Sequence, residues 1–497
     1  QMCIRDRIYG TVAESLWNIN WMIYRKPNLP PGSKLLDSYS IGSDKYYVEL
    51  WTHGGQGFYI VSEIEASPEV IELINIIAEV IRRLGLDISS EKLSDSINYV
   101  LDMIGENPDE KTMKVINHYL SKLTNPYQIL EPLFLDPDVE EITVPDVSLD
   151  VYVRHRRYPD LQWFKTNIRY PTQDILNSFI QRLAVMSGKS ISPSNPYVEC
   201  KAPDGSRLTL VYGREVSGGP SLTVRKYPEE PWTIIRLIAL DAISPEAAAY
   251  LWILHDAKGV LFISGPMASG KTTLLNALLL LTDPRKKVVT LEETPELNLP
   301  HPLWQRMYTR EVPFYSQLKP VTLWDLAVWS LRSRGDYVVI GEARGEEIIA
   351  LVQQSLFGTG ALTTIHATSP EDLISRLLSP PLNLPKHWLS SIWTVVQLRN
   401  IGGWRGVTDI VEFDKDGKMV PIFKRKGRRD RLKPLVDVTE TYRMKLASSL
   451  LIIGEEIKKE FEMRVEFLNE MLERRIFRYV DLKDELTKFY AERSVVK

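Results

Sequence analysis

Residues 265–272 read Gly-Pro-Met-Ala-Ser-Gly-Lys-Thr, which fits the pattern G-x-x-x-x-G-K-[ST] of a phosphate-binding loop. Glycines allow backbone N–H groups to wrap around phosphates, and a helix that begins at the lysine directs its positive end toward them. We expect Lys271 to reach the β- and γ-phosphates of ATP and Thr272 to offer its hydroxyl group to Mg²⁺. The predicted nucleotide-binding residues are Gly265, Pro266, Met267, Ala268, Ser269, Gly270, Lys271, Thr272 and Thr273.

Carboxylates follow two apolar segments downstream of this loop. Glu342 comes directly after the end of segment 337–340, and an acidic group follows segment 287–291: Glu292, Glu293 and Glu296. Because the carboxyl ends of parallel strands share one edge of a sheet, we expect both groups to converge near the γ-phosphate. There Glu342 could hold Mg²⁺ through water or orient the attacking water. A single glutamate is usually a solvated loop charge, but two acidic groups at strand ends favour a role in the site.

A histidine and several arginines are further candidates. His366 follows a third apolar segment, 361–365, where a structural hydrogen bond and a nucleotide-sensing role are both open. The arginines gather near Glu342 and in the preceding region: Arg332, Arg334, Arg344, Arg207, Arg214 and Arg225. An arginine donated by another domain or subunit can stabilise transition-state charge, whereas a surface ion pair is the alternative for each of them.

The elements that must position these residues alternate between strand and helix from 232 to 440, which predicts a parallel sheet. We expect strands at 260–264, 287–291, 337–340 and 361–365, and helices at 233–239, 245–255, 271–281, 323–333 and 346–358. Upstream, 124–231 has a mixed pattern, with strands expected at 141–144, 151–153 and 207–211 and a helix at 173–187. Residues 8–123 predict a hairpin at 45–51 and 57–61 followed by helices, and 441–497 predict a C-terminal helical segment.

Composition narrows the class of protein. The chain has 497 residues, which suggests several domains, and its net charge of −3 gives no general attraction to nucleic acid. Two cysteines, Cys3 and Cys200, cannot form a four-cysteine zinc site and fit a reducing cytosol. No run approaches the roughly 18 apolar residues of a spanning helix, so work at a membrane would require docking. We expect residues 1–7 to be a non-native start.

Four motifs stand in order along the chain: SGPMASGKTT, LEETPEL, VVIGEARGEE and TTIHATS. Their series resembles the Walker A, Asp box, Walker B and His box of the secretion ATPase superfamily, which serves type II and type IV secretion systems, type IV pili and the archaellum. The similarity covers about 126–423 and includes YQILEPLFLDPDVEEITV, PDGSRLTL, GGPSLTVRKYPEEP and RLLSPPLNLP. The TVRKYP segment and the style of the N-terminal region resemble the archaeal branch.

The resemblance implies an α/β fold, with a RecA-like P-loop motor domain at 232–440, a PAS-like α/β N-terminal domain at 124–231 and extra helical segments at both ends. It also implies a homohexamer with ATP and Mg²⁺ between the two domains. By motif match, the catalytic residues would be Glu292 as general base, Glu342, Lys271, His366, and Arg214 and Arg225 from the N-terminal domain. The family usually has Glu-Asp where this chain has Glu292 and Glu293, so which of the two is the base stays open, and we expect activity to be retained.

The leading hypothesis is a hexameric ATPase that powers assembly of a type IV pilus-like filament or archaellum, or protein secretion across the membrane. Its implied partners are a polytopic membrane platform protein and pilin-like or archaellin-like machinery, and it would be cytoplasmic, at the inner face of the cell membrane. The alternatives are a RecA-like nucleic-acid translocase, against which the net charge counts, and a regulatory nucleotide-binding subunit without turnover.

Residues 424–433 form a strongly basic run between two strand-like segments. This run could help docking on acidic partner loops or on anionic lipid. A solvated hairpin tip is the alternative interpretation.

Overall fold

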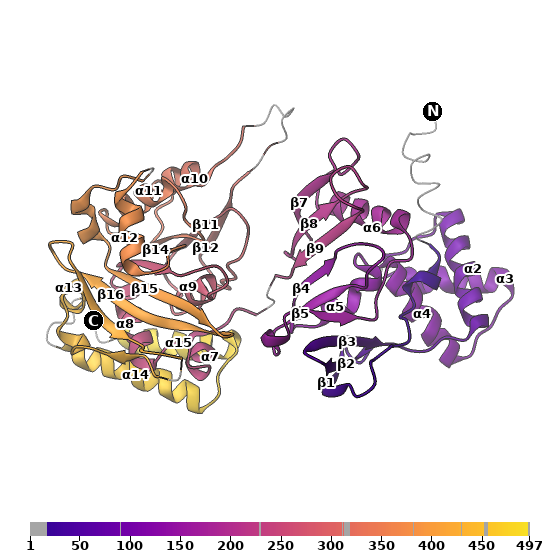
Figure 1. Cartoon of the computed structure of the whole chain (residues 1–497), viewed down its shortest axis with the longest axis horizontal. Coiled ribbons are helices and arrows are strands. Elements are labelled where there is room, and N and C mark those ends of the chain that lie inside the picture. The colour runs from indigo at the N-terminus through magenta and orange to yellow at the C-terminus, as the bar shows by residue number, and fades with distance from the viewer. Residues whose placement is uncertain are drawn as a thin grey trace. The chain divides into compact units, whose positions relative to one another are not determined.

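The structure is a computed structural model that describes residues 17–89, 91–227, 230–310, 312, 319–380, 382–428, 430–451 and 456–495. The chain divides into two compact units, Gln1–Pro228 and Glu229–Lys497, which we call unit 1 and unit 2 and describe separately (Figure 1). The expected non-native start, 1–7, lies outside the described residues. Within the described part of the chain, no helix is both long and apolar enough to cross a membrane.

Unit 1 contains a sheet whose described strands lie in the order β1-β2-β3-β6-β5-β4-β9-β8-β7. The bounds are β1 (Lys34–Ile41), β2 (Tyr46–His53), β3 (Gln56–Ser62), β4 (Val139–Val144), β5 (Tyr152–His155), β6 (Phe164–Thr166), β7 (Tyr197–Lys201), β8 (Arg207–Val211) and β9 (Ser221–Arg225). The expected hairpin is β2 and β3, preceded by β1. It joins the later strands because β3 pairs in parallel with β6.

The junction between β3 and β6 depends on a close approach at Gly57. A Cβ atom at this position would lie 2.7 Å from the ring of Phe164, which is fully buried. The same core cluster contains residues from both 8–123 and 124–231. The boundary that the sequence suggested between residues 123 and 124 therefore lies inside one compact unit.

The helices of unit 1 are α2 (Pro68–Leu84), α3 (Leu93–Ile104), α4 (Glu110–Thr124), α5 (Glu131–Leu135) and α6 (Gln173–Met186). Helix α2 shows how local interactions determine where a helix begins and ends. Ser67 accepts a hydrogen bond from the Val70 N–H at its start, and Gly85, at φ 63°, ends it in the left-handed conformation. Its buried residues recur at helical spacing: Ile74, Ile77, Ala78 and Ile81.

Unit 2 contains a second sheet, with described strands in the order β12-β11-β13-β14-β10-β15-β16-β17-β18. The bounds are β10 (Val260–Ser264), β11 (Val288–Glu292), β12 (Trp304–Tyr308), β13 (Tyr337–Ile340), β14 (Gly360–Ile365), β15 (Thr394–Ile401), β16 (Trp404–Phe413), β17 (Met419–Lys424) and β18 (Lys433–Pro434). In this spatial order, the first six strands, from β12 through β11, β13, β14 and β10 to β15, pair in parallel. Strands β16, β17 and β18 then extend the sheet from β15 by antiparallel pairing.

The strand order identifies the fold of unit 2. Strand β10, which precedes the phosphate loop, lies between β14 and β15, with β13 and then β11 beyond β14. Every residue of β10, β11, β13 and β14 is buried, as in a parallel sheet covered on both faces by helices. This is the RecA-like P-loop arrangement that the sequence predicted.

The helices of unit 2 are α7 (Ile234–Ala239), α8 (Pro245–Asp256), α9 (Lys271–Leu279), α10 (Leu323–Ser330), α11 (Glu347–Ser355), α12 (Pro370–Leu378), α13 (Tyr442–Leu451), α14 (Ile457–Glu473) and α15 (Tyr479–Val495). Helices α14 and α15 pack into this unit through α8. Arg464 forms a 2.7 Å ion pair with Asp256, and the indole N–H of the fully buried Trp252 donates to the hydroxyl oxygen of Tyr490 at 2.8 Å.

Candidate active site at the strand ends of unit 2

The phosphate loop connects the end of β10 with the start of α9, and two of its glycines are required by the local geometry. A Cβ atom at Gly265 would lie 2.6 Å from the Ser269 hydroxyl oxygen and 2.8 Å from the Leu398 carbonyl oxygen. Gly270 caps α9 at φ 94°, a conformation that favours glycine. The hydroxyl group of the fully buried Ser269 donates to the Pro266 carbonyl at 2.8 Å, which closes the loop on itself.

Lys271 and Thr272 are the first two residues of α9. The ammonium group of Lys271 donates to the Pro266 carbonyl at 2.9 Å and lies 3.3 Å from Nδ1 of His366. Burial lowers the pKa of Lys271, while the nearby carboxylates of Glu342 and Glu296 oppose that change. The Thr272 hydroxyl donates to Oε2 of Glu296 at 3.1 Å. The loop cation and the loop hydroxyl are therefore both close to acidic side chains.

Glu342 follows β13 and lies between a histidine and an arginine. Its Oε2 accepts a 2.8 Å hydrogen bond from Arg344, and its Oε1 lies 2.7 Å from Nε2 of His366 in a contact that is close but not aligned as a hydrogen bond. Burial alone would raise the pKa of Glu342, but Arg344, His366 and Lys271 together outweigh burial and the pKa is lowered. Burial, and then Lys271, lower the pKa of His366. At neutral pH the geometry thus holds an ionised carboxylate beside a neutral imidazole.

Glu292 is the last residue of β11, one residue beyond the predicted end of that strand. It is 2% exposed, and its Oε1 accepts the backbone N–H groups of Glu296 and Leu297, each at 2.8 Å. Among the residues that the structure describes, its Oε2 has no hydrogen-bond partner. Burial raises the pKa of Glu292 from 4.5 to about 7. The side chain packs on Gly341, where a Cβ atom would lie 3.1 Å from Cγ of Glu292.

One residue of the site was expected only as a member of an acidic group and had no individual role in the sequence interpretation. Glu296 was grouped with the other acidic residues after β11, but its contact with Thr272 spans 24 positions and depends on the turn that Glu292 shapes. The pattern LEETPEL contains the residue without indicating which carboxylate faces α9. Glu293, by contrast, is half exposed and lies 3.9 Å from Arg344.

The two predicted arginines belong to unit 1. Arg225 ends β9 and, with Arg207 and Trp163, lines a pocket of about 260 Å³ on one face of the sheet. Arg214 is exposed in the loop between β8 and β9. Their participation in the nucleotide site remains a prediction.

A family model described as Type II/IV secretion system protein matches residues 128–397, which is more than half of the chain. The chain belongs to this family. An uncharacterized protein of Methanocaldococcus jannaschii, MJ0900, is 33% identical over 387 residues, which is 73% of this chain and 67% of that protein. Protein VirB11 of Agrobacterium fabrum is 26% identical over 235 residues, 40% of this chain and 67% of VirB11. The X-ray structure of the ATPase DotB of Legionella pneumophila is 18% identical, covers 69% of this chain and 86% of DotB, and has a TM-score of 0.41.

The Type II/IV secretion system family is one of secretion and motor ATPases. Its matched region begins in unit 1 and ends in β15 of unit 2, so it contains Arg214 and Arg225 as well as the phosphate loop, Glu342 and His366. Residues before 128 and after 397 lie outside the family match. These residues include the β1–β3 meander, α2 to α4 and the C-terminal helices.

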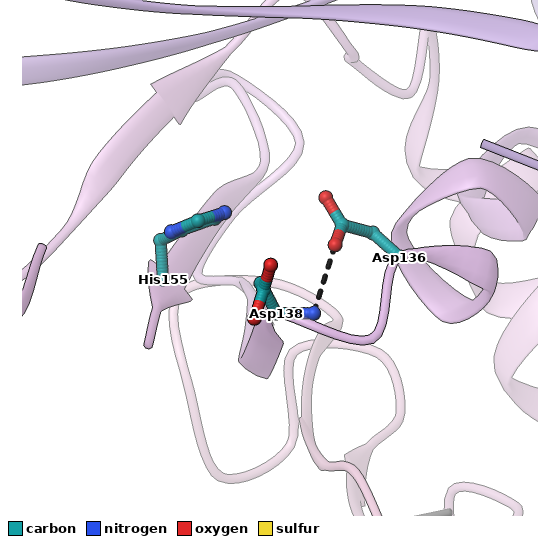
Figure 2. A group of neighbouring side chains, drawn as sticks. All are labelled: Asp136, Asp138 and His155. Carbon is teal, nitrogen blue, oxygen red and sulfur yellow. Dashed lines mark hydrogen bonds between the residues drawn. The ribbon is translucent and has the colours of Figure 1, made fainter. Parts of the chain in front are cut away.

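Unit 1 contains a second cluster of polar side chains. Asp136, Asp138 and His155 each place one potential ligand atom within 4.8 Å of the others (Figure 2). Asp136 already accepts hydrogen bonds from the hydroxyl groups of Tyr39 at 2.7 Å and Tyr59 at 2.8 Å, and from the Asp138 N–H at 2.8 Å. Its carboxylate is therefore satisfied by the protein itself.

The other two members of this cluster also have partners. The Nε2 atom of His155 lies 2.9 Å from the Tyr39 hydroxyl oxygen, and Arg157 forms an ion pair with Asp138. A positive charge is thus already supplied where a cation would bind. We interpret the cluster as a structural network that connects β1, β3 and β5 with the segment before β4.

Proposed function

We propose that the protein hydrolyses ATP with Mg²⁺ and powers filament assembly or protein secretion. One observation carries this proposal: Lys271 and Thr272 lie beside side chains at three neighbouring strand ends. His366 lies 3.3 Å from Lys271, and Glu296 accepts the Thr272 hydrogen bond. A phosphate loop alone only holds a triphosphate. Carboxylates placed around its lysine and threonine supply the groups that hydrolysis requires.

The residues fit both cofactors. The Thr272 hydroxyl and the carboxylates of Glu296 and Glu342 are oxygen donors, the type that Mg²⁺ prefers. The turn at Gly265 and Gly270 presents backbone N–H groups at the start of α9, where phosphates bind. When bound, Mg²⁺ would neutralise charge that develops on the phosphate oxygens.

Each side chain has a separate proposed role. Lys271 binds the β- and γ-phosphates, Glu342 holds the metal through water, and His366 positions both of them. Glu292 is the proposed general base, because a pKa of about 7 suits proton transfer at neutral pH and its Oε2 has no competing partner. Glu296 directs the Thr272 hydroxyl group. Glu293, half exposed, is the less suitable of the two adjacent glutamates.

ATPase rates of the parent, Lys271→Ala and Glu342→Gln test the proposal. We expect both variants to lose about a hundredfold or more in kcat. Glu342→Gln should still bind a fluorescent ATP analogue, which separates loss of chemistry from loss of folding. Equal rates in all three proteins would exclude the enzyme and support a regulatory nucleotide-binding subunit. Stimulation by DNA or RNA would instead support the translocase alternative.

We further propose a homohexamer that is cytoplasmic, at the inner face of the cell membrane, with Arg214 and Arg225 completing the nucleotide site. Membership of a secretion and motor ATPase family supports this assembly. A polytopic platform protein and pilin-like or archaellin-like subunits are the proposed partners. Light scattering with and without ATP tests the hexamer. Arg225→Ala tests the arginine: kcat should fall while the oligomeric state is kept, and an unchanged kcat would remove Arg225 from the site.

A further inference from the structure

Two adjacent hairpins of unit 2 bring cationic side chains together. Strands β15 and β16 form the first hairpin (Figure 1), and β17 pairs with β16 before the chain continues through 425–432 to β18. Segment 425–428 lies against the first hairpin. The Arg425 N–H donates to the Thr408 carbonyl, and an added Cβ at Gly402 would lie 3.2 Å from Arg428. Seven exposed cations lie on these strands and the segment after β17, with Arg399 and Arg405 on opposite sides of the end of the first hairpin. We call this set the basic face: Arg399, Arg405, Lys424, Lys426, Arg428, Arg431 and Lys433.

The segment between β17 and β18 is anchored at two points. Arg425 is 4% exposed, pairs with Asp241 at 2.9 Å, and its guanidinium group stacks 4.5 Å from the ring centroid of Trp404. Leu432 is also buried. Between these two buried residues, Lys426, Arg428 and Arg431 are exposed. A solvated tip would need no such anchors.

The charges of the basic face are only partly compensated, because Asp409 lies opposite Lys424 across β16 and β17, and Glu371 is close enough for Lys424 and Arg399 to lower its pKa. In the described part of the chain, none of the seven cations forms an ion pair within 4.0 Å. Asp430 is the exposed acidic residue within 424–433. Like charges held together repel one another, and a negatively charged surface would relieve that repulsion. The whole chain has a net charge of −3, so this is a local concentration of positive charge.

Apolar side chains among these cations distinguish the possible ligands. Ile401 at the first hairpin tip, and Leu435 and Val436 directly after β18, are exposed. Nucleic-acid strands are usually bound by cations together with exposed aromatic rings on which bases stack. Here Trp404 is covered by Arg425. Cations interspersed with aliphatic side chains instead suit the boundary between lipid headgroups and acyl chains.

We propose that the basic face docks on an anionic lipid bilayer. Its lysines and arginines contact headgroup phosphates, and Ile401, Leu435 and Val436 enter the region below them. This binding does not depend on ATP hydrolysis, so its test is separate from that of the proposed function.

Flotation of the full chain with vesicles tests the proposal. One set contains phosphatidylcholine with about 30% phosphatidylglycerol, and the other phosphatidylcholine alone. We expect flotation with the anionic vesicles only, and less of it as salt is raised. The triple variant Lys426→Gln/Arg428→Gln/Arg431→Gln should bind about a hundredfold more weakly, at about fivefold for each lost charge.

A matched triple variant removes the same charge elsewhere. Lys26→Gln/Lys111→Gln/Lys189→Gln changes three exposed lysines of unit 1 and should bind like the parent. Leu435→Ser/Val436→Ser should weaken binding without changing its salt dependence. The proposal is overturned if the parent does not float, if both triple variants respond equally, or if the face binds a single-stranded oligonucleotide but no vesicle. Thermal melts of all variants should match the parent, since every changed side chain is exposed.

Discussion

The Thr272 hydroxyl group donates to Oε2 of Glu296 at 3.1 Å, although Thr272 is the second residue of α9 and Glu296 belongs to the turn after β11. That turn is shaped by Glu292, whose Oε1 accepts two of its backbone N–H groups. Glu292 therefore places Glu296, and Glu296 in turn orients the hydroxyl group proposed to bind Mg²⁺. Because the two carboxylates differ in burial and in partners, substitutions can separate their contributions.

Glu296→Gln is expected to weaken the use of Mg²⁺ more than the binding of ATP. The amide oxygen can still accept the Thr272 hydrogen bond, but the negative charge beside the metal site is lost. We expect the Mg²⁺ concentration for half-maximal ATPase rate to rise about tenfold. Glu293→Gln, at a half-exposed neighbour 3.9 Å from Arg344, is the matched control. Equal effects of the two substitutions would contradict a specific role for Glu296.

Glu292→Gln is expected to stabilise the protein in a pH-dependent way. Burial raises the pKa of Glu292 from 4.5 to about 7, so between these values the folded state binds more protons than the unfolded state, and stability falls as pH rises. The difference corresponds to roughly 3 kcal/mol at pH 8. Glutamine cannot ionise but keeps an oxygen for both N–H groups. Its melting temperature should exceed the parent's at pH 8 and approach it near pH 5, whereas a constant offset would contradict this pKa.

The same substitution tests catalysis. If Glu292 is the general base, the parent's kcat rises with pH through about 7, because the base must lose its proton to act. Glu292→Gln should abolish that rise and lower kcat by a factor of about 10² to 10⁴. If the variant keeps the parent's rate and pH profile, Glu292 is not the general base, and its role is limited to holding the turn after β11.

The sequence predicted the centre of unit 2 better than its edges, for physical reasons. Strands β10 and β13 occupy the predicted residues because each is buried on both faces and is followed directly by a glycine. In unit 1, strand β6 was not predicted, since three residues are too few to show a period of two. Strand β12, at one end of the sheet's strand order, is only partly buried and carries Arg306, which weakens its apolar pattern.

The candidate site, too, could be predicted from the sequence only in part. The phosphate loop could be predicted because its chemistry lies in consecutive residues. The partnership of Thr272 and Glu296 could not, since it arises from a turn held by a tertiary set of hydrogen bonds. Likewise, no local pattern indicates that Gly57 must admit the ring of Phe164, which joins β3 to β6.

Gly57→Ala should therefore destabilise unit 1. The added Cβ would lie 2.7 Å from the Phe164 ring, which is fully buried and cannot move away freely. We expect a loss of about 1–3 kcal/mol in the free energy of unfolding. Gly218→Ala is the control, because nothing lies within 4 Å of its added Cβ. Urea denaturation followed by circular dichroism measures both, and equal stability of the two variants would refute the close β3–β6 packing.

Arg464→Met tests whether the C-terminal helices are part of unit 2. Arg464 is 3% exposed and pairs with Asp256 on α8 at 2.7 Å, while its guanidinium group lies 5.1 Å from the ring centroid of Trp252. Removing Arg464 takes the counter-charge from the buried Asp256 carboxylate, which then keeps the hydrogen bond from the Tyr490 hydroxyl group, so we expect a loss of about 3–5 kcal/mol. Arg474→Met removes solvent-screened pairs with Glu470 and Glu485 and should lower the stability far less.

The double variant Arg464→Met/Asp256→Leu separates the interaction between Arg464 and Asp256 from the effect of removing the arginine charge alone. With both charges gone, Asp256 no longer contributes a buried charge, and apolar side chains of similar size can fill the space. Glu460, which also pairs with Arg464, loses that partner in both the single and the double variant, so its effect cancels between them. Most of the lost stability should return, measured as a coupling free energy in the double-mutant cycle. A double variant no more stable than Arg464→Met would show that α14 does not pack on α8 through this pair. Unfolding of residues 441–497 would then be expected as a separate transition at lower denaturant.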